Sequence, residues 1–175
     1  MTRIETAERV TAHAGLLDWL GRHHVEFELH EHPLTFTARE TARAEGVDPS
    51  TFAKVVGVIT SDGRRALLVV ESDDHVDLLK ARHLLGAGHV RLLKEDELVE
   101  LAPDCAVGTI PPVGELFDVP VYADHAIREG PEISFHAGSH RHAVRVDRAE
   151  WERSGNVTFG DLAVDREGIP AWALS

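Results

Sequence analysis

Residues 52–71 read FAKVVGVITSDGRRALLVVE, and this stretch decides the fold class. It contains two apolar, β-branched runs, residues 52–60 and 65–71, which are typical of strands. Asp62 and Gly63 stand between the runs, and Asp-Gly is the strongest short-range signal for a hairpin turn. The sequence therefore predicts two neighbouring antiparallel strands.

Three elements are predicted upstream of this pair. Residues 5–21 carry apolar side chains three to four positions apart, as on one stripe of a helix that Gly21 can end: Val10, Ala14, Leu17 and Leu20. Residues 25–29 alternate between apolar and polar side chains, which indicates a strand with one buried face. Thr37 stands three positions before Glu40, the spacing of a capping box, so a second helix is expected to run to Gly46.

Seven elements are predicted downstream. Glycines close a helix over residues 75–85, and a short strand over 89–93 and a helix with an acidic first turn over 95–101 follow. Three more strands are expected over 119–123, 132–136 and 143–146, with a short helix over 148–151. Because the strands do not alternate regularly with helices, we expect an α+β fold with a mixed, largely antiparallel sheet flanked by helices.

Length and composition favour one domain inside the cell. The chain has 175 residues and 43% hydrophobic content, enough for one compact core, which we expect over residues 1–154. Residues 155–175 are too apolar for a disordered tail, so we expect a C-terminal extension docked on the domain or on a partner. No apolar run approaches the roughly 18 residues of a membrane span. Cys105 is the only cysteine, which excludes an internal disulfide and a multi-cysteine zinc site and fits a cytoplasmic protein.

The net charge of −12 argues against a protein that coats nucleic acid, because phosphate binding depends on lysine and arginine. An RNA ligand would need a local basic surface. Residues 95–132 carry ten acidic residues against Arg128 alone, so the charge is polarised along the chain. Candidate cations lie elsewhere: Arg39, Arg43, Lys54, Arg64, Arg65, Lys80, Arg82, Arg91, Arg141 and Arg145. Scattered, solvated side chains are the alternative.

Lys54 is a cation inside an apolar run, which costs free energy unless the ammonium is paired or faces a cleft. At the mouth of a pocket it could bind a phosphate or stabilise charge on an ester oxygen. The alternative is a lysine at a strand edge whose ammonium reaches water.

Two glycine-containing segments could line a pocket. Residues 108–114 read GTIPPVG, where glycines permit close backbone approach and prolines fix the path of the chain. Residues 137–139 read AGS and form a second tight turn with a hydroxyl group. A plain connecting loop and a plain β-turn explain the two segments equally well.

Twelve histidines raise the question of a metal site. His30 with His32, and His140 with His142, have the spacing that puts two rings on one face of a strand. No HExxH motif occurs, and surface histidines are the alternative. No GxSxG motif occurs either, so Ser139 shows no sign of a nucleophile elbow.

Eight short motifs follow one another in a recognisable order: EHP (31–33), FTARE (36–40), AKVV (53–56), DLLK (77–80), GTIPPVG (108–114), VPVY (119–122), FHAGS (135–139) and AVR (143–145). Together they resemble the YbaK/EbsC family, also described as the prolyl-tRNA synthetase-associated or insertion-type editing domain. The resemblance covers residues 16–153. No single motif is specific, whereas the ordered set is.

The resemblance implies a domain that hydrolyses mischarged aminoacyl-tRNA in trans, without metal, cofactor or covalent enzyme intermediate. In the family, a functional lysine, a GxxxP loop and a turn facing that loop form the pocket. The matching residues here are Lys54, Gly108 and Ser139, expected to be catalytic, and His32, Thr37, Pro112 and Gly138, expected to bind substrate. Three further residues are expected to bind substrate because they adjoin these motifs in the sequence: Pro111, Arg141 and Arg145. The implied partner is the acceptor end of aminoacyl-tRNA, with an aminoacyl-tRNA synthetase as a second candidate.

The substrate is less well defined. The chain reads Ile110-Pro111-Pro112 where other members often have Ser-Pro, which adds rigidity and removes a hydroxyl group. Both expected pocket walls consist of backbone and small side chains, so we expect a small aminoacyl group such as alanyl, cysteinyl or seryl. Two alternatives stay open, a non-catalytic binding module and a histidine-dependent metallohydrolase.

Overall fold

The predicted hairpin is the centre of the molecule. The computed structural model describes residues 12–35 and 37–165. Strands β2 (Ala53–Thr60) and β3 (Arg65–Glu71) pair antiparallel. Gly63 adopts φ +89° in the turn, and its amide donates to the carbonyl of Thr60 over 2.9 Å. The hairpin turn that Asp62 and Gly63 predicted is therefore confirmed.

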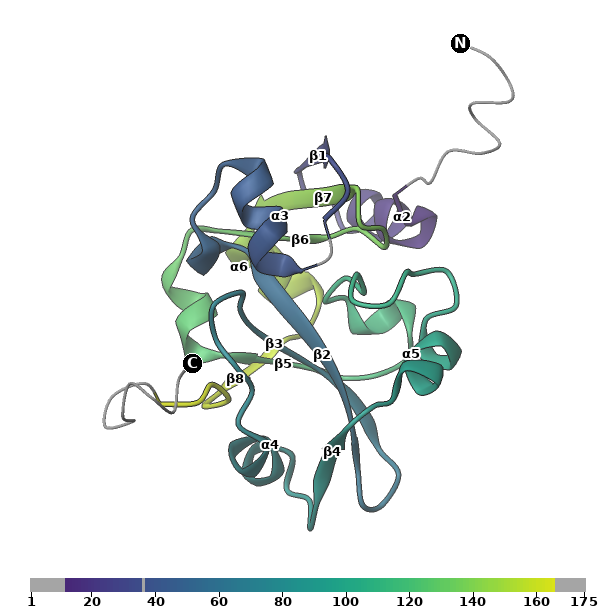
Figure 1. Ribbon diagram of the computed structural model, residues 1–175, viewed down its shortest axis with the longest axis vertical. Helices are drawn as coiled ribbons and strands as arrows, with labels where there is room; N and C mark the ends of the chain where they lie inside the picture. The colour runs from purple at the N-terminus through teal and green to yellow at the C-terminus, as the bar shows by residue number, and fades with distance from the viewer. Residues whose placement is uncertain (1–11, 36, 166–175) are drawn as a thin grey trace.

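This hairpin belongs to a five-stranded sheet in the order β4-β2-β3-β5-β8 (Figure 1). Strand β4 (Val90–Leu92) extends it antiparallel beside β2. Strands β5 (Val121–Asp124) and β8 (Thr158–Gly160) extend it on the other side, and both run parallel to β3. The sheet is thus mixed, as expected.

A second, three-stranded sheet lies above the first in the view of Figure 1. Its strands β1 (Phe27–Glu31), β7 (His142–Asp147) and β6 (Glu132–His136) are all antiparallel. A parallel bridge between Phe52 and Ser134 joins β6 to the start of β2. The expected α+β class with mixed, mostly antiparallel strands is confirmed, and the strands form two sheets instead of one.

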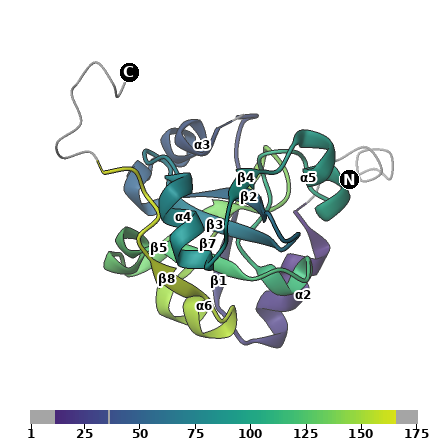
Figure 2. The same cartoon turned by 90° about the horizontal axis from the view of Figure 1, so that it is seen from below.

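In the part of the chain that the structure describes, five α-helices flank the sheets: α2 (Ala14–Arg22), α3 (Ala38–Glu45), α4 (Leu78–Leu85), α5 (Glu95–Leu101) and α6 (Arg148–Ser154). Short 3-10 turns lie at η1 (Pro49–Thr51), η2 (Gly114–Leu116) and η3 (His125–Glu129). In the perpendicular view, α3 and α5 lie on one side of the strands and α2 and α6 on the other (Figure 2). Within the described ranges, no helix is both long and apolar enough to span a bilayer.

The five-stranded sheet is buried on both faces. Leu67 and Val69 belong to the main core together with Trp19 of α2 and Trp151 of α6. The alternate residues of β3, such as Leu68, pack under α4. Burial on both faces explains why the two strands read as nearly continuous apolar runs instead of alternating ones.

The capping box that starts α3 is present as predicted. The Thr37 hydroxyl accepts the amide of Glu40 over 3.0 Å, and the Glu40 carboxylate accepts the amide of Thr37 over 3.1 Å. Gly46 ends the helix at φ +71°, a conformation that glycine adopts without strain. The capping box and the glycine therefore predicted both ends of α3 correctly.

Two burial expectations were wrong. Phe27 and Leu29 of β1 are 39% and 45% exposed, because β1 is the outer strand of its sheet and the core on that face is filled from β6 and β7. In α2, Leu16 and Trp19 are buried while Ala14 is exposed, since the larger side chains remove more apolar area from water. The part of the predicted helix before residue 12, including Val10, lies outside the described residues.

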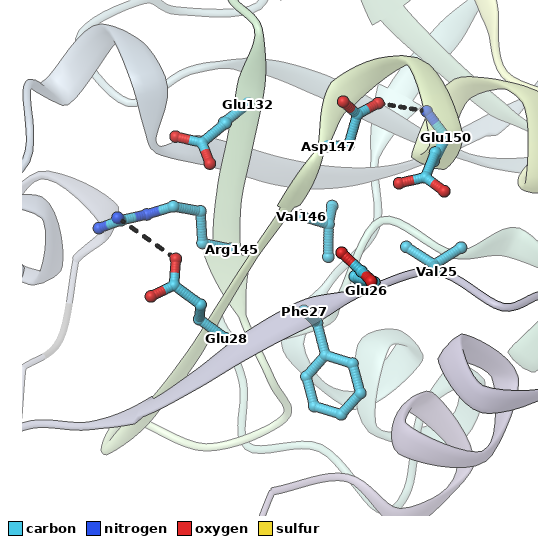
Figure 3. Close-up of a pocket in the computed structure, with 9 residues that line it drawn as sticks. All are labelled: Val25, Glu26, Phe27, Glu28, Glu132, Arg145, Val146, Asp147 and Glu150. Carbon is cyan, nitrogen blue, oxygen red and sulfur yellow. Dashed lines mark hydrogen bonds and ion pairs between the residues drawn. The ribbon is translucent and has the colours of Figure 1, made fainter.

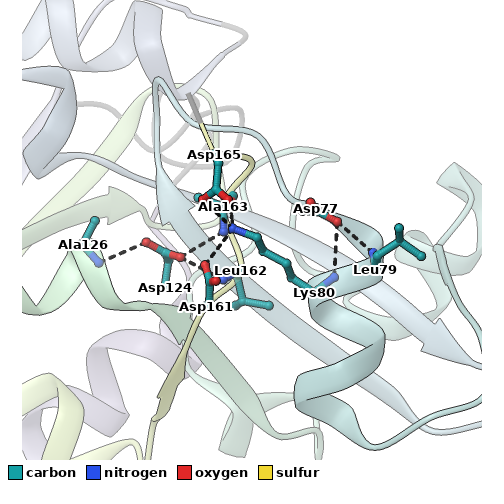
Figure 4. Close-up of polar contacts among 9 residues, drawn as sticks. All are labelled: Asp77, Leu79, Lys80, Asp124, Ala126, Asp161, Leu162, Ala163 and Asp165. Atoms are coloured by element: carbon teal, nitrogen blue, oxygen red, sulfur yellow. Dashed lines mark hydrogen bonds and ion pairs between the residues drawn. The ribbon is translucent and has the colours of Figure 1, made fainter. Parts of the chain in front are cut away.

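The segment after α6 joins the sheet through β8 and is fastened at Lys80 (Figure 4). The Lys80 ammonium donates to Asp161, to the carbonyl of Ala163 and to Asp165 at 2.7–2.9 Å. These hydrogen bonds raise the pKa of Lys80. Asp124 of β5 accepts the amides of Leu162 and Ala163, both at 2.9 Å. The same segment pairs with Val76, which holds residues 75–77 extended, so α4 begins later than predicted.

Candidate functional site

Two of the expected segments meet directly. The amide of Gly138 donates to the carbonyl of Thr109 over 3.0 Å, and the amide of Ala106 donates to the carbonyl of Gly138 over 3.1 Å. Gly108 and Gly138 adopt φ +87° and +89°, a region that side chains other than glycine rarely enter. The GxxxP loop and the AGS turn are therefore one hydrogen-bonded unit.

A third segment, residues 32–35 between β1 and α3, holds the other side of the same turn. The amide of His32 donates to the carbonyl of Arg141 over 2.8 Å, and the amide of Thr35 donates to the carbonyl of His140 over 3.2 Å. The turn over residues 138–141 is thus fixed from two sides. His32, an expected pocket residue, is only 6% exposed, and its Nδ1 donates to the carbonyl of Pro33 over 2.7 Å.

Histidines fill the space beside this turn. Nε2 of His136 lies 2.7 Å from the hydroxyl of Thr41, which lies 2.6 Å from that of Thr35. The His136 ring is 6.4 Å from the His140 ring, edge to face. His140 in turn lies over Gly108, where an added Cβ would be 3.9 Å from its Cε1.

Burial is the main reason why the pKa of His136 falls to about 3, and nearby His140 and His32 lower it further. The ring is therefore neutral at pH 7 and acts as a hydrogen-bonding group. Sequence analysis missed His136, Thr41 and Thr35. The signal available was the pair His136 and His140, which flank the AGS turn at i, i+4.

Lys54 lies on β2, opposite Val70, and is half-buried. Its ammonium donates to the carbonyl oxygen of Asp74. Phe52 precedes it by two residues and packs against His136, with ring centroids 5.2 Å apart. Contacts therefore run from Phe52, two residues before Lys54 in the chain, through His136 and His140 to Gly108.

Ser139, expected to be catalytic, and the two prolines, expected to bind substrate, are all buried. Ser139 is 1% exposed, and its Oγ accepts the amide of Arg141 over 3.1 Å. Pro111 and Pro112 are buried, and the carbonyl of Pro112 accepts the indole N–H of Trp151 over 2.9 Å. These groups stiffen the site, since their polar atoms are already bonded inside the protein.

Thr37 and the two expected arginines are placed differently. The hydroxyl of Thr37 caps α3, so its position is set by the helix. Arg141 is exposed at the tip of the turn, next to the other residues of the site. Arg145 is not brought to them. It lines a hollow of about 590 Å³ on the three-stranded sheet and pairs with Glu28 at 3.7 Å (Figure 3).

The hollow around Arg145 is acidic. Five carboxylates line it against the single guanidinium: Glu26, Glu28, Glu132, Asp147 and Glu150 (Figure 3). A phosphate approaching this surface would meet more negative than positive charge. Arg145 is therefore poorly placed to contact RNA.

The side chains considered as nucleophile or metal ligand are buried or already paired. Burial raises the pKa of the Cys105 thiol to about 12, so it holds its proton at neutral pH. His30, one of the histidines considered for a metal, lies 3.3 Å from the carboxylate of Glu45. Among residues 12–35 and 37–165, no three histidine, cysteine or acidic side chains are grouped as a metal site requires.

Comparison with known proteins identifies the family. Residues 32–154 match the model of the aminoacyl-tRNA editing domain. The chain is 36% identical over 141 residues to the proline--tRNA ligase of Shouchella clausii, covering 79% of this chain and 24% of the ligase. It is 32% identical over 137 residues to that of Halalkalibacterium halodurans, covering 77% and 23%. The chain belongs to the aminoacyl-tRNA editing domain family, and it spans about a quarter of the length of these ligases.

Solved structures share the fold. A structure described as a proposed trans-editing enzyme for prolyl tRNA synthetase superposes with a TM-score of 0.75 at 27% identity, covering 86% of this chain and 95% of that one. The hypothetical protein APE2540 superposes with a TM-score of 0.78 at 21% identity, covering 85% and 99%. The second likeness concerns the fold alone.

Proposed function

We propose that this protein is an aminoacyl-tRNA deacylase that acts in trans and hydrolyses the ester of a mischarged tRNA. The observation that carries the proposal is the unit made by the GxxxP loop and the 138–141 turn, against which His136 and Phe52 pack, with Lys54 two residues after Phe52 on the chain. Membership of the editing domain family supports it, as does the likeness to a structure described as a trans-editing enzyme.

The chemistry suits such a site because an aminoacyl ester is already activated. It needs positioning and stabilisation of the developing oxyanion more than a strong nucleophile. Gly108 is exposed and has no Cβ, so the substrate can approach the backbone closely. In this proposal Lys54 binds the terminal phosphate or the ester oxygen, and its bond to the carbonyl of Asp74 fixes the ammonium.

Water is the proposed nucleophile, with the free 2′-hydroxyl of the terminal adenosine helping to orient it. Two observations favour water over a side chain. The Ser139 hydroxyl is buried and bonded within the turn, and the raised pKa of Cys105 keeps its thiol protonated. We therefore propose hydrolysis without a covalent intermediate and without a metal ion.

A small aminoacyl group is the proposed substrate. Residues 109–114 are buried, and the indole of Trp151 holds the carbonyl of Pro112, so this wall is stiff. A stiff wall rejects large side chains by steric clash but discriminates poorly among small ones, since one methylene changes binding by only about 1–3 kcal/mol. Exposed Arg141 is the proposed contact to the acceptor end. A cytoplasmic location and an interaction with a synthetase follow from this substrate.

A panel of charged tRNAs tests the proposal. Initial rates of deacylation are compared for tRNAs that carry alanine, serine, cysteine, proline, leucine and phenylalanine, with and without chelator. We expect the small esters to be cleaved fastest and the chelator to have no effect. Binding without hydrolysis would favour the binding module, and loss of activity to chelator with recovery on adding zinc would favour a metallohydrolase. Fastest cleavage of the leucyl or phenylalanyl ester would contradict the small pocket.

A further inference from the structure

Two arginines stand on the exposed side of α3, together with Glu40 and Ala44. The helix buries Ala38, Thr41 and Ala42 against the domain. Arg39 and Arg43 stand four positions apart and are both exposed, so their guanidinium groups project from one side of the helix. We call this pair the α3 arginine face.

The α3 arginine face adjoins Lys54. Nε of Arg39 lies 3.2 Å from the Asp73 carboxylate, and the next residue, Asp74, accepts the Lys54 ammonium through its carbonyl. Ala38 and Ala42 pack in one cluster with Phe52, which is two residues from Lys54 along the chain. Arg39 and Lys54 therefore contact the same short loop, although they come from two separate elements, and Arg43 lies one turn of α3 further along.

Two hollows elsewhere on the surface are acidic and repel phosphate. The hollow around Arg145 has five carboxylates, and a neighbouring hollow of about 360 Å³ adds Glu71 and Glu129 and shares Glu132. With a net charge of −12, the protein as a whole repels a polyanion. RNA must therefore bind where cations are locally concentrated.

We propose that Arg39 and Arg43 bind backbone phosphates of the tRNA acceptor strand whose 3′ end reaches Lys54. This inference rests on the proposed function, which places the aminoacyl ester near Lys54. Arg39 exchanges Asp73 for a phosphate, which is possible because its side chain is 66% exposed and exposed ion pairs are weak. Arg43 has no carboxylate within ion-pair distance among the described residues, and guanidinium groups bind phosphate oxygens in a bidentate manner.

Salt-dependent binding tests the α3 arginine face. The probe is an uncharged tRNA transcript labelled at its 5′ end, and anisotropy is followed between 50 and 200 mM KCl. Each lost phosphate contact lowers the slope of log K against log salt by about 0.7–0.9. We therefore expect the double variant R39Q/R43Q to lose about 1.4–1.8 in slope and roughly tenfold or more in affinity at low salt.

Two control variants accompany it. Arg82→Gln removes an exposed arginine from α4, another eight-residue helix, and should leave affinity and slope unchanged. R39K/R43K keeps both charges and should keep the slope while losing part of the affinity, because lysine binds phosphate as a point charge. Thermal melting checks that every variant is folded, which the exposure of both arginines leads us to expect.

Wild-type affinity and slope in R39Q/R43Q would overturn the inference, and so would an equal loss in Arg82→Gln. The proposed function has a separate readout, hydrolysis by the wild-type protein of the alanyl ester of a CCA trinucleotide. That ester has no acceptor stem. If the trinucleotide ester is cleaved and R39Q/R43Q binds tRNA normally, the α3 contact is wrong while the proposed function stands. If the wild-type protein cleaves neither this trinucleotide ester nor any aminoacyl-tRNA of the panel, the proposed function fails. The binding data still decide the role of the arginines.

Discussion

Oγ of Ser139 lies 2.7 Å from Nδ1 of His142. Burial lowers the pKa of His142, against the opposing effect of Glu31, whose carboxylate is 3.6 Å from Nε2. The ring is therefore neutral at pH 7, with its proton on Nε2 towards Glu31 and the Ser139 proton directed to Nδ1. The three groups have the order of a catalytic triad, yet the serine hydroxyl is enclosed. This burial supports the proposal that the pair holds the turn and that water, not Ser139, attacks the substrate.

Replacing the serine tests that proposal. Ser139→Ala leaves Nδ1 of His142 and the amide of Arg141 without their partner, so the free energy of unfolding should fall by about 1–3 kcal/mol. Turnover should fall moderately, by roughly tenfold, because the turn is less well positioned. Urea unfolding and initial rates measure the two effects. Cys105→Ala is the control and should change the rate little; trapping an aminoacyl group on Ser139 would contradict the assignment.

Lys54 should be required for activity but not for folding. Lys54→Met keeps most of the side-chain volume and removes the charge proposed to act on the ester, so turnover should be lost while the melting temperature stays near the wild-type value. The matched control is Lys94→Met, which removes an exposed lysine at the start of α5. Near-normal turnover by a folded Lys54→Met protein would show that the role given to Lys54 is wrong.

The two glycines of the site should differ in how they tolerate alanine. Both replacements force a side chain into the left-handed region, at a cost of about 1–2 kcal/mol. At Gly138 the new Cβ would also lie 2.9 Å from Cβ of His13, which adds about 1–3 kcal/mol of overpacking, whereas at Gly108 the nearest atom is 3.9 Å away. Unfolding in urea should therefore rank Gly138→Ala as the less stable variant. The reverse order would contradict the packing described here.

Stability should depend on pH through Glu71. Burial chiefly, and then nearby carboxylates beginning with Asp74, raise the pKa of Glu71 from 4.5 to about 7. The folded state thus holds a proton that the unfolded state releases. The stabilising contribution of this proton to the free energy of unfolding is fully present below about pH 4.5 and is lost as the pH rises to about 7. The Glu71→Gln variant has no carboxyl group to titrate, so it does not lose this stability. The difference in melting temperature between the variant and wild type should therefore increase in favour of the variant from pH 5 to pH 8.

His136 acts in the opposite direction, since its lowered pKa makes stability increase with pH between about 3 and 6.5. Wild type and Glu71→Gln both contain His136, so the difference between their melting temperatures reports the effect of Glu71 alone. Glu26→Gln, which removes an exposed carboxylate, should show no such pH dependence. A constant difference between Glu71→Gln and wild type at all pH values would refute the assignment.

The elements that sequence predicted well are those with local signals. The Asp62-Gly63 turn and the Thr37 capping box depend on residues only a few positions apart, and both are present. The exposure of Phe27 was missed because it depends on which strand ends the sheet, a property that the alternation of side chains does not contain. The start of α4 was missed for a similar reason, since residues 75–77 are held by a segment some 85 positions later.

The same distinction applies to the candidate site. Sequence motifs indicated Gly108 and Gly138, and hydrogen bonds join their two segments in the structure. Arg145 was grouped with Arg141 because the two are near in sequence, yet it lines an acidic hollow. His136 was passed over as one of twelve histidines, because its burial and its bond to Thr41 arise only when α3 packs on β6.

The parallel pairing of β5 with β8 also has a consequence during synthesis. Of the described strands, β8 is the last to leave the ribosome, and until then β5 presents an unpaired edge beside β3. The hydrogen bonds of the Lys80 ammonium can form only after that, because all three of its acceptors, Asp161, Ala163 and Asp165, follow β8. A nascent chain therefore has an open β5 edge between the synthesis of β5 and that of β8, and this is the stage at which pairing with another unfinished copy competes with folding.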